Sequence, residues 1–99
     1  MKVLISDYAK QQLQLIFSYY VEVASHAIAK NIIAEISKSF QLLEQFPEAG
    51  QPDEFMKHHK KEYRRLVSGN YKIIYCIREN EVHISDVFDS RQNPEKQHS

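Results

Sequence analysis

Residues 63–77, "YRRLVSGNYKIIYCI", contain a short polar turn between two runs in which apolar residues recur at about every second position. Ser68, Gly69 and Asn70 supply the positive φ angles that a tight hairpin turn needs. Successive strand residues point to opposite faces, so one face collects Tyr71, Ile73, Tyr75 and Ile77, and the other collects Lys72, Ile74, Cys76 and Arg78. The stretch predicts a β-hairpin with one apolar face and one face that carries cations.

We expect further strands on both sides of this hairpin. Residues 79–81 form the next turn, and "VHISDVF" (82–88) follows as the last strand, with an inward face of Val82, Ile84 and Phe88. At the start of the chain, "KVLIS" (2–6) predicts a short first strand. Within the hairpin, we expect Arg65 to lie across from Lys72.

Between the first strand and the hairpin, apolar residues recur with the period of an α-helix. Ser6 or Asp7 can cap a first helix, because a side-chain oxygen there accepts from the free first-turn amides. Ser25 can cap a second helix, which Pro47 and Gly50 end. The first stripe contains Ala9, Leu13, Ile16, Phe17, Tyr20 and Ala24, and the second contains Ala29, Ile32, Ile33, Ile36, Phe40 and Leu43. Almost no loop separates the stripes, which predicts an antiparallel helical hairpin.

These elements predict the order β-α-α-β-β-β, an α+β fold in which the helical hairpin covers one face of a mostly antiparallel sheet. The length of 99 residues suits a single domain spanning 1–99, with residues 90–99 as a flexible tail. Cys76 is the single cysteine, so no internal disulfide can form, and a reducing, cytoplasmic location is favoured. No apolar run approaches the roughly 20 residues of a membrane span, so we expect no membrane association.

Because the helices cover only one side, the other face of the sheet is a candidate binding surface. Lys72 and Arg78 project from it, with Ile74 and Cys76 between them. Residues 57–65, "KHHKKEYRR", add five cations and one carboxylate. The whole chain, however, carries 13 basic and 13 acidic residues, whereas a dedicated nucleic-acid binder usually has a basic excess. The cations are therefore either a solvated surface or a contact for a polyanion or an acidic protein.

The remaining groups indicate no cofactor and one further candidate contact. Adjacent His58 and His59 would point to opposite faces of a strand, and no Cys or His partner has ligand spacing, so we expect neither a metal nor another cofactor. Leu15, Tyr19 and Val23 lie off the apolar stripe of the first helix. They either pack against the second helix or stay exposed for a partner.

The order and spacing of these segments resemble the RelE/ParE superfamily of bacterial toxins. The resemblance rests on "YRRLVSGNYKIIYCI" followed by a short turn and "VHISDVFDSRQNP", together with "SYYVEVAS" and "LLEQFPEAGQP", and it covers nearly the whole chain. The family consists of small toxins of type II toxin–antitoxin modules, each neutralised by a co-expressed antitoxin. One branch enters the ribosomal A site and cuts mRNA, and the other poisons DNA gyrase without cutting anything itself.

The resemblance also implies candidate site residues. Lys72 stands where the mRNA-cutting branch has an arginine after the turn tyrosine, and Arg91 matches its arginine after the last strand. Arg64 or Arg65 lies near the basic pair of that branch. A nuclease would therefore use Arg65, Lys72 and Arg91 as catalytic residues. The wider target-binding set is Arg64, Arg65, Lys72, Arg78 and Arg91.

The chain departs from the nuclease pattern near its C-terminal end. No tyrosine occurs in the last strand or after it, the tail offers only His98, and Asp86 and Asp89 bring negative charge close to Arg91. The ending "FDSRQNP" (88–94) is more similar to the ParE branch. An ion pair between Arg91 and one of these carboxylates could instead hold the chain end to the sheet.

We therefore expect a gyrase-directed toxin that is not an enzyme, with DNA gyrase and a cognate antitoxin as its partners. A RelE-like, ribosome-dependent mRNA endonuclease is the alternative, with the ribosome and mRNA as partners. An inactive homologue that only binds the antitoxin is a third interpretation. Leu15, Tyr19 and Val23 are the expected antitoxin contact.

Overall fold

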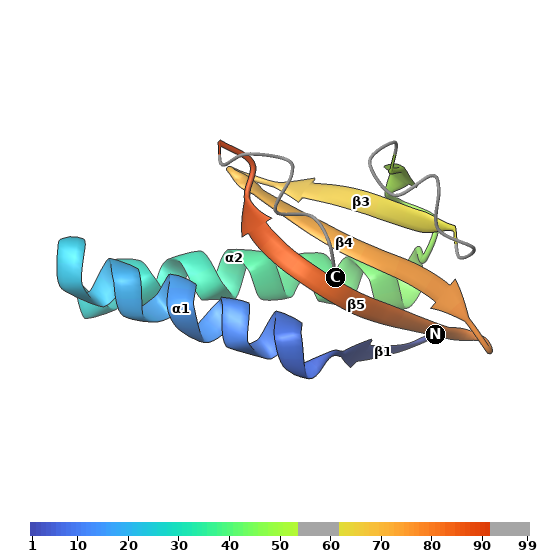
Figure 1. Ribbon diagram of the computed structural model, residues 1–99, viewed down its shortest axis with the longest axis horizontal. Coiled ribbons are helices and arrows are strands. Elements are labelled where there is room, and N and C mark those ends of the chain that lie inside the picture. The colour runs from blue at the N-terminus through green and yellow to red at the C-terminus, as the bar shows by residue number, and fades with distance from the viewer. Residues whose placement is uncertain (54–61, 92–99) are drawn as a thin grey trace.

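The computed structural model describes residues 1–53 and 62–91 (Figure 1). The elements in chain order are β1 (Lys2–Ile5), α1 (Asp7–Val23), α2 (His26–Gln45), β2 (Gln51–Pro52), β3 (Tyr63–Ser68), β4 (Tyr71–Arg78) and β5 (Glu81–Asp89). The described strands form a sheet in the order β1-β5-β4-β3-β2, in which the β1–β5 pairing is parallel and the others are antiparallel. The predicted α+β fold is confirmed, with the two-residue β2 as an unpredicted addition.

Both helices begin where a serine caps them. The Ser6 side chain accepts a hydrogen bond from the Ala9 amide at 3.0 Å, and Ser25 accepts one from the Ile28 amide at 3.1 Å. Ser6 is thus the N-cap of α1. Asp7 lies in the first turn, where the negative charge of a carboxylate interacts favourably with the helix dipole and stabilises the helix. The helix α2 ends at Gln45, just before Pro47.

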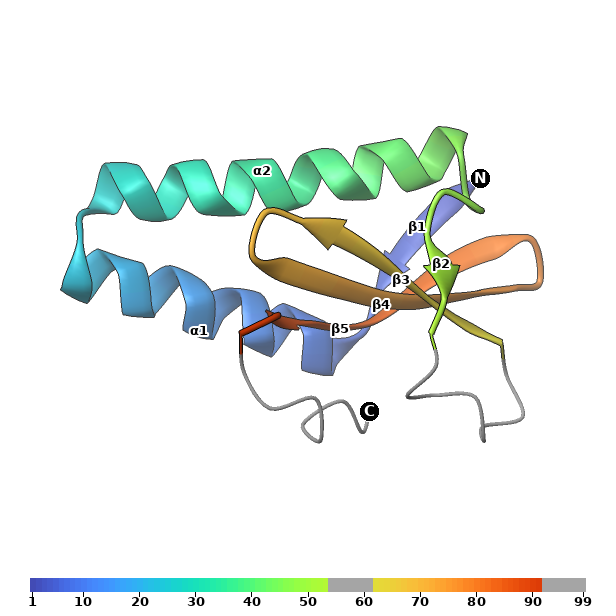
Figure 2. The same cartoon turned by 90° about the horizontal axis from the view of Figure 1, so that it is seen from above.

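The two helices lie side by side and pack on one face of the sheet through the predicted stripes. Figure 2 shows that the turn between α1 and α2 lies beyond the end of the sheet. The core between the layers contains Ala9, Ile36, Phe40, Leu43, Tyr71, Ile73, Tyr75, Val82, Ile84 and Val87. Ala24 was predicted within the first stripe. It is instead the exposed C-cap of α1, at the turn that lies beyond the end of the sheet. The far half of the hairpin is therefore left without a sheet beneath it.

A buried tyrosine fixes the connection between the helices and the sheet. The Tyr75 hydroxyl donates to the Pro47 carbonyl at 2.8 Å and accepts from the Gly50 amide at 2.9 Å. A Cβ at Gly50 would lie 2.6 Å from the Arg65 carbonyl oxygen and 2.7 Å from the Tyr75 hydroxyl. Glycine is needed here because no larger residue fits against the Arg65 carbonyl and the Tyr75 hydroxyl. Gly50 was expected only to help end α2, but it also allows the loop after α2 to pack closely on the sheet.

A β-bulge in β5 changes which of its residues face the helices. Ile74 pairs with Asp86 and Tyr75 pairs with Ile84, so Ser85 has no opposite residue in β4. The alternation therefore shifts by one position after Ile84, and Val87 joins the core in place of Phe88. The prediction that Phe88 faces inward is wrong. Phe88 is buried on the opposite face of the sheet, across from Lys72.

Candidate functional site

The sheet face opposite the helices, called the outer face below, carries the expected cations at separate places. Alternation along the strands assigns it the side chains of Tyr63, Arg65, Val67, Lys72, Ile74, Cys76, Arg78, His83, Asp86 and Phe88. Lys72 lies beside the β3–β4 turn, and Arg78 lies at the other end of β4. Six strand residues span about 20 Å, so one phosphate group cannot contact both.

The middle of the outer face is less open than the alternation predicted. Ile74 and Cys76 have exposed fractions of only 1% and 5%. Cross-strand neighbours flank both, because Arg65 and Asp86 lie across from Ile74, while Tyr63 and His83 lie across from Cys76. The expectation of an exposed apolar strip between the cations is therefore wrong.

Arg65 lies across from Ile74, two residues along β4 from its predicted partner Lys72. The two-residue turn places Ser68 opposite Tyr71, so Val67 faces Lys72 and Arg65 faces Ile74. The Arg65 guanidinium donates to the Pro52 carbonyl at 3.1 Å and lies 3.8 Å from a carboxylate oxygen of Asp53. These contacts hold β2 against β3.

Arg64 does not belong to the outer face. It pairs with Tyr75, and its guanidinium donates to the Gly50 carbonyl at 2.8 Å and to the Glu48 carbonyl at 3.5 Å. The two adjacent arginines therefore point to opposite sides of β3 and bind the backbone that leads from α2 into β2. Because they are adjacent in the sequence, Arg64 and Arg65 suggested a single basic pair, but side chains of adjacent strand residues point to opposite faces of the sheet.

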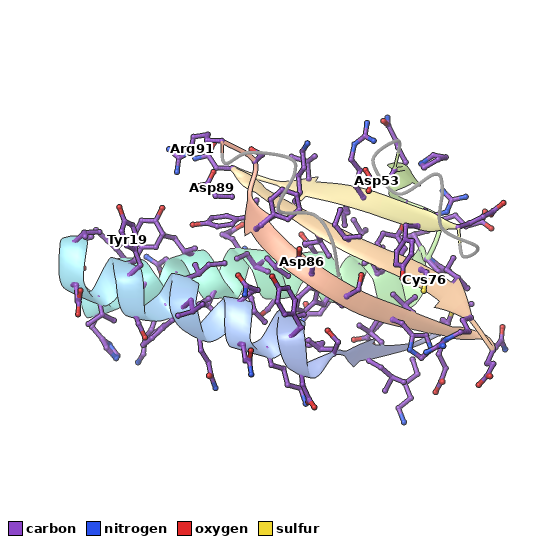
Figure 3. The ribbon with its side chains drawn as sticks, viewed as in Figure 1. Tyr19, Asp53, Cys76, Asp86, Asp89 and Arg91 are labelled. Atoms are coloured by element: carbon purple, nitrogen blue, oxygen red, sulfur yellow. The ribbon has the colours of Figure 1, made fainter. Side chains whose placement is uncertain are left out.

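Arg91 forms a bidentate ion pair with Asp89. Its Nε and Nη2 atoms donate to the two Asp89 carboxylate oxygens at 2.9 Å and 2.6 Å, and its backbone amide donates at 2.9 Å. Figure 3 shows the two side chains together at the end of β5. The hydrogen bond from the Arg91 side chain holds the pKa of Asp89 below its ordinary value. Of the two predicted partners, Asp89 forms the ion pair, which links Arg91 to the last residue of β5.

Two tyrosines lie next to this ion pair. Burial, together with a hydrogen bond to Tyr20, raises the pKa of Tyr71 above its ordinary value. Tyr20 comes from α1 and Tyr71 from the start of β4. The contact thus joins the helical hairpin to the same end of the sheet at which Lys72 and Arg91 lie.

The expected antitoxin contact borders a groove between α1 and β5, called the α1–β5 groove below. Leu15, Tyr19 and Val23 have exposed fractions of 63%, 57% and 58%, which excludes their packing against α2. The groove has a volume of about 590 Å³ and includes Leu15 and Tyr19 but not Val23. Its lining is Tyr8, Gln12, Leu15, Ile16, Tyr19, Tyr20, Tyr71, Asp86, Val87, Phe88, Asp89 and Arg91.

The sequence reasoning missed the β5 wall of this groove and the Tyr8–Gln12 end of its helical wall. In the structure β1 has four residues and β5 has nine, so β1 cannot cover the whole length of β5. The strands β1 and β5 pair in parallel, although they are the first and last strands of the sequence. Hydrophobic periodicity alone does not reveal such a pairing.

Several predictions concern residues outside the described ranges. The basic run at Lys57, Lys60 and Lys61, the adjacent His58 and His59, and His98 all lie there. Within residues 1–53 and 62–91, no group of three or more His, Cys, Asp or Glu side chains is arranged to hold a metal ion. The helices of the same part of the chain are too short or too polar to cross a membrane.

Comparison with known proteins adds the family. A family model described as "ParE toxin of type II toxin-antitoxin system, parDE" matches residues 3–94. The chain belongs to this ParE toxin family. The predicted resemblance to the RelE/ParE superfamily, and to its ParE branch, is thereby confirmed.

A solved structure supports the ParE fold of this toxin. The "Chromosomal ParDE TA system from P. aeruginosa" matches with a TM-score of 0.77 and 19% sequence identity, over 90% of this chain and 95% of that chain. At this identity the likeness shows the fold. A search of curated proteins found no match. Membership in a ParE toxin family of a type II module implies a cognate antitoxin as partner.

Proposed function

We propose that this chain is a toxin that inhibits DNA gyrase and that a cognate antitoxin neutralises it by binding at the α1–β5 groove. The family match over residues 3–94 carries the first part of the proposal, because the ParE branch is the gyrase-directed one. The exposed apolar side chains of Leu15 and Tyr19 support the second part, because exposed apolar surface beside a groove favours a protein partner.

The arrangement of the cations also favours gyrase over RNA cleavage. Cleavage through a 2′-hydroxyl needs a base, an acid and cations around one phosphate. Among the described residues, Arg64 and Arg65 bind the backbone near β2, Arg91 binds Asp89, and Arg78 lies far from Lys72. Lys72 and Arg78 lie on the outer face, and we propose both as contacts for the target.

A supercoiling assay with purified toxin and purified gyrase tests the target. We expect the toxin to inhibit supercoiling, and we expect its induction in bacteria to bring the DNA-damage response and filamentous cells. Primer extension on mRNA from the same cells is the control. New 5′ ends in phase with codons, seen only during translation, would establish the mRNA endonuclease instead. Normal growth with soluble, folded toxin present would favour the inactive homologue.

A further inference from the structure

A small pocket, called the Arg78 pocket below, lies on the outer face and has a volume of about 210 Å³. Its lining is Leu4, Ile5, Ser6, Tyr63, Cys76, Arg78, His83, Ile84 and Ser85, and it shares no lining residue with the α1–β5 groove. The register explains how four strands contribute to it, because Tyr63 and His83 lie across from Cys76, and Leu4 lies across from His83. Figure 3 shows Cys76 on β4, in the half of the sheet away from the Arg91–Asp89 ion pair.

Arg78 differs from the other arginines in what its guanidinium contacts. In the part of the chain that the structure describes, Arg64, Arg65 and Arg91 donate to carbonyl or carboxylate oxygens. The exposed Arg78 has neither, and its Nη2 atom lies 3.4 Å from Nδ1 of His83. A guanidinium has five N–H donors, so this contact leaves most of them available to a ligand.

His83 orients the Arg78 guanidinium and also engages the nearest carboxylate. Because a guanidinium only donates, Nδ1 of His83 must accept, and the neutral ring carries its proton on Nε2. Glu81 is the cross-strand neighbour of Arg78, but its carboxylate lies 3.7 Å from Nε2 of His83 and forms no ion pair with Arg78 among the described residues. The positive charge of Arg78 is therefore not matched by a contact within the described chain.

The size and the lining of the pocket indicate which anion fits. Small-molecule sites usually have volumes above roughly 300 Å³, so this pocket suits one side chain rather than a nucleotide. Leu4 and Tyr63 offer apolar surface to the methylene groups of such a side chain, and the guanidinium fork of Arg78 matches the two oxygens of a carboxylate. A nucleic-acid backbone would also pass Glu79 and Glu81 in the adjoining turn, whose charges repel phosphates.

We propose that the Arg78 pocket receives an aspartate or glutamate side chain of gyrase, so that the toxin recognises its target through a protein carboxylate and not through DNA phosphate. This inference rests on the proposed function, since it takes gyrase as the target and Arg78 as one of its contacts. It adds Leu4 and Tyr63 to the residues that contact the target.

Replacement of Arg78 tests the role of the charge in a supercoiling assay. We expect Arg78→Ala to raise the toxin concentration that halves gyrase activity at least about ten-fold, as for the loss of hydrogen bonds to a charged group. Arg78→Lys keeps the charge without the bidentate geometry and should raise it less. Lys38→Ala removes a cation from α2 and is the matched control, which should stay within about two-fold of the parent chain. An equal loss for Lys38→Ala would show a response to net charge alone and would overturn the proposal.

A variant that fills the pocket separates entry into the pocket from attraction at a distance. Val3 and Ile5 pack against the core, so Leu4 points to the outer face, and Leu4→Trp occupies the pocket while Arg78 stays in place. We expect this variant, with its fold verified by its melting curve, to lose inhibition to the same extent as Arg78→Ala. Full inhibition by the folded variant would contradict insertion of a side chain.

Cross-linking identifies the partner group and does not depend on the Leu4 variant. A carbodiimide joins an amine to a carboxylate, so the Arg78→Lys variant mixed with purified gyrase without DNA should become coupled at position 78 to an aspartate or glutamate of gyrase. Mass spectrometry of the digested complex locates the coupled residues. No coupling at position 78, together with binding that requires DNA and weakens steeply with salt, would assign Arg78 to a phosphate and overturn the inference. A parent chain that leaves supercoiling unaffected would overturn the proposed function itself.

Discussion

At the scale of single residues, the Tyr75 hydroxyl has the most clearly defined structural role. Changing Tyr75 to Phe removes the partner of a buried Gly50 amide and one donor to the Pro47 carbonyl. A buried amide left without a partner costs about 1–3 kcal/mol. We expect the free energy of unfolding to fall by that amount in urea titrations. Tyr19→Phe, which alters an exposed hydroxyl, is the control and should unfold like the parent chain.

The Arg91–Asp89 ion pair predicts a pH-dependent part of the stability. Because Arg91 lowers the pKa of Asp89 in the folded state, the ionised carboxylate stabilises the fold above its unfolded pKa of about 3.9, and this stabilisation disappears as the pH falls through the folded pKa. We expect Asp89→Asn to lower the melting temperature at pH 7. The difference from the parent chain should vanish in acid, and a difference that is constant with pH would contradict the assignment.

Two cations at the same end of the sheet should behave differently when they are replaced. Lys72 lies on the outer face, and we expect Lys72→Ala to reduce toxicity and to change the free energy of unfolding by under about 1 kcal/mol, as is usual for a charge near the surface. Arg91→Ala breaks the contact with Asp89 and should lower the melting temperature. Growth assays and melting curves on both variants and on the double variant check this. Full toxicity in the double variant would remove both residues from the target site.

At the scale of elements, we expect the two ends of helix α1 to contribute differently to antitoxin binding. Leu15 and Tyr19 line the α1–β5 groove, whereas Val23 lies near the hairpin turn, outside it. We expect Leu15→Ser and Tyr19→Ser to weaken antitoxin binding at least about ten-fold, as typical for truncation of a central apolar contact, and Val23→Ser to weaken it less. Calorimetric titration measures the three affinities.

Val67 provides a matched control for this series. Its exposed fraction of 58% equals that of Val23, but it lies on β3, on the far side of the sheet from the groove. Val67→Ser should leave the antitoxin affinity unchanged. A loss for Val67→Ser that equals the loss for Tyr19→Ser would place the antitoxin elsewhere on the molecule.

At the scale of the whole molecule, neutralisation predicts coupling between antitoxin binding and stability. A partner that binds only the folded chain stabilises it by about 2.7 kcal/mol when its free concentration is 100 times the dissociation constant. We therefore expect the melting temperature of the toxin to rise with antitoxin concentration. Expression of the chain alone should arrest growth, and co-expression of the antitoxin should restore it. An unshifted melting temperature at saturating antitoxin would contradict binding to the folded state.

The sequence by itself determined the elements of this protein, because their signals are local. Hydrophobic period, the serine caps at Ser6 and Ser25, and the turn at Gly69 depend on residues a few positions apart, and the structure confirms them. Of the three turn residues expected at positive φ, Gly69 has a φ of 59°, and the expectation for Ser68 and Asn70 is wrong. The same local patterns, arranged in their order, carried the resemblance to a toxin family that the match over residues 3–94 establishes.

The tertiary structure alone decided which groups meet. The bulge at Ser85 moved Phe88 to the outer face, because one extra residue in a strand reverses the faces of the side chains that follow it. The position of the hairpin turn decided that Arg65 lies across from Ile74 and not from Lys72. Because β1 pairs with only the first half of β5, no strand among the described residues pairs with the outer side of the second half. Such contacts join residues far apart in the chain, and their geometry depends on the packing of the whole sheet rather than on any local pattern.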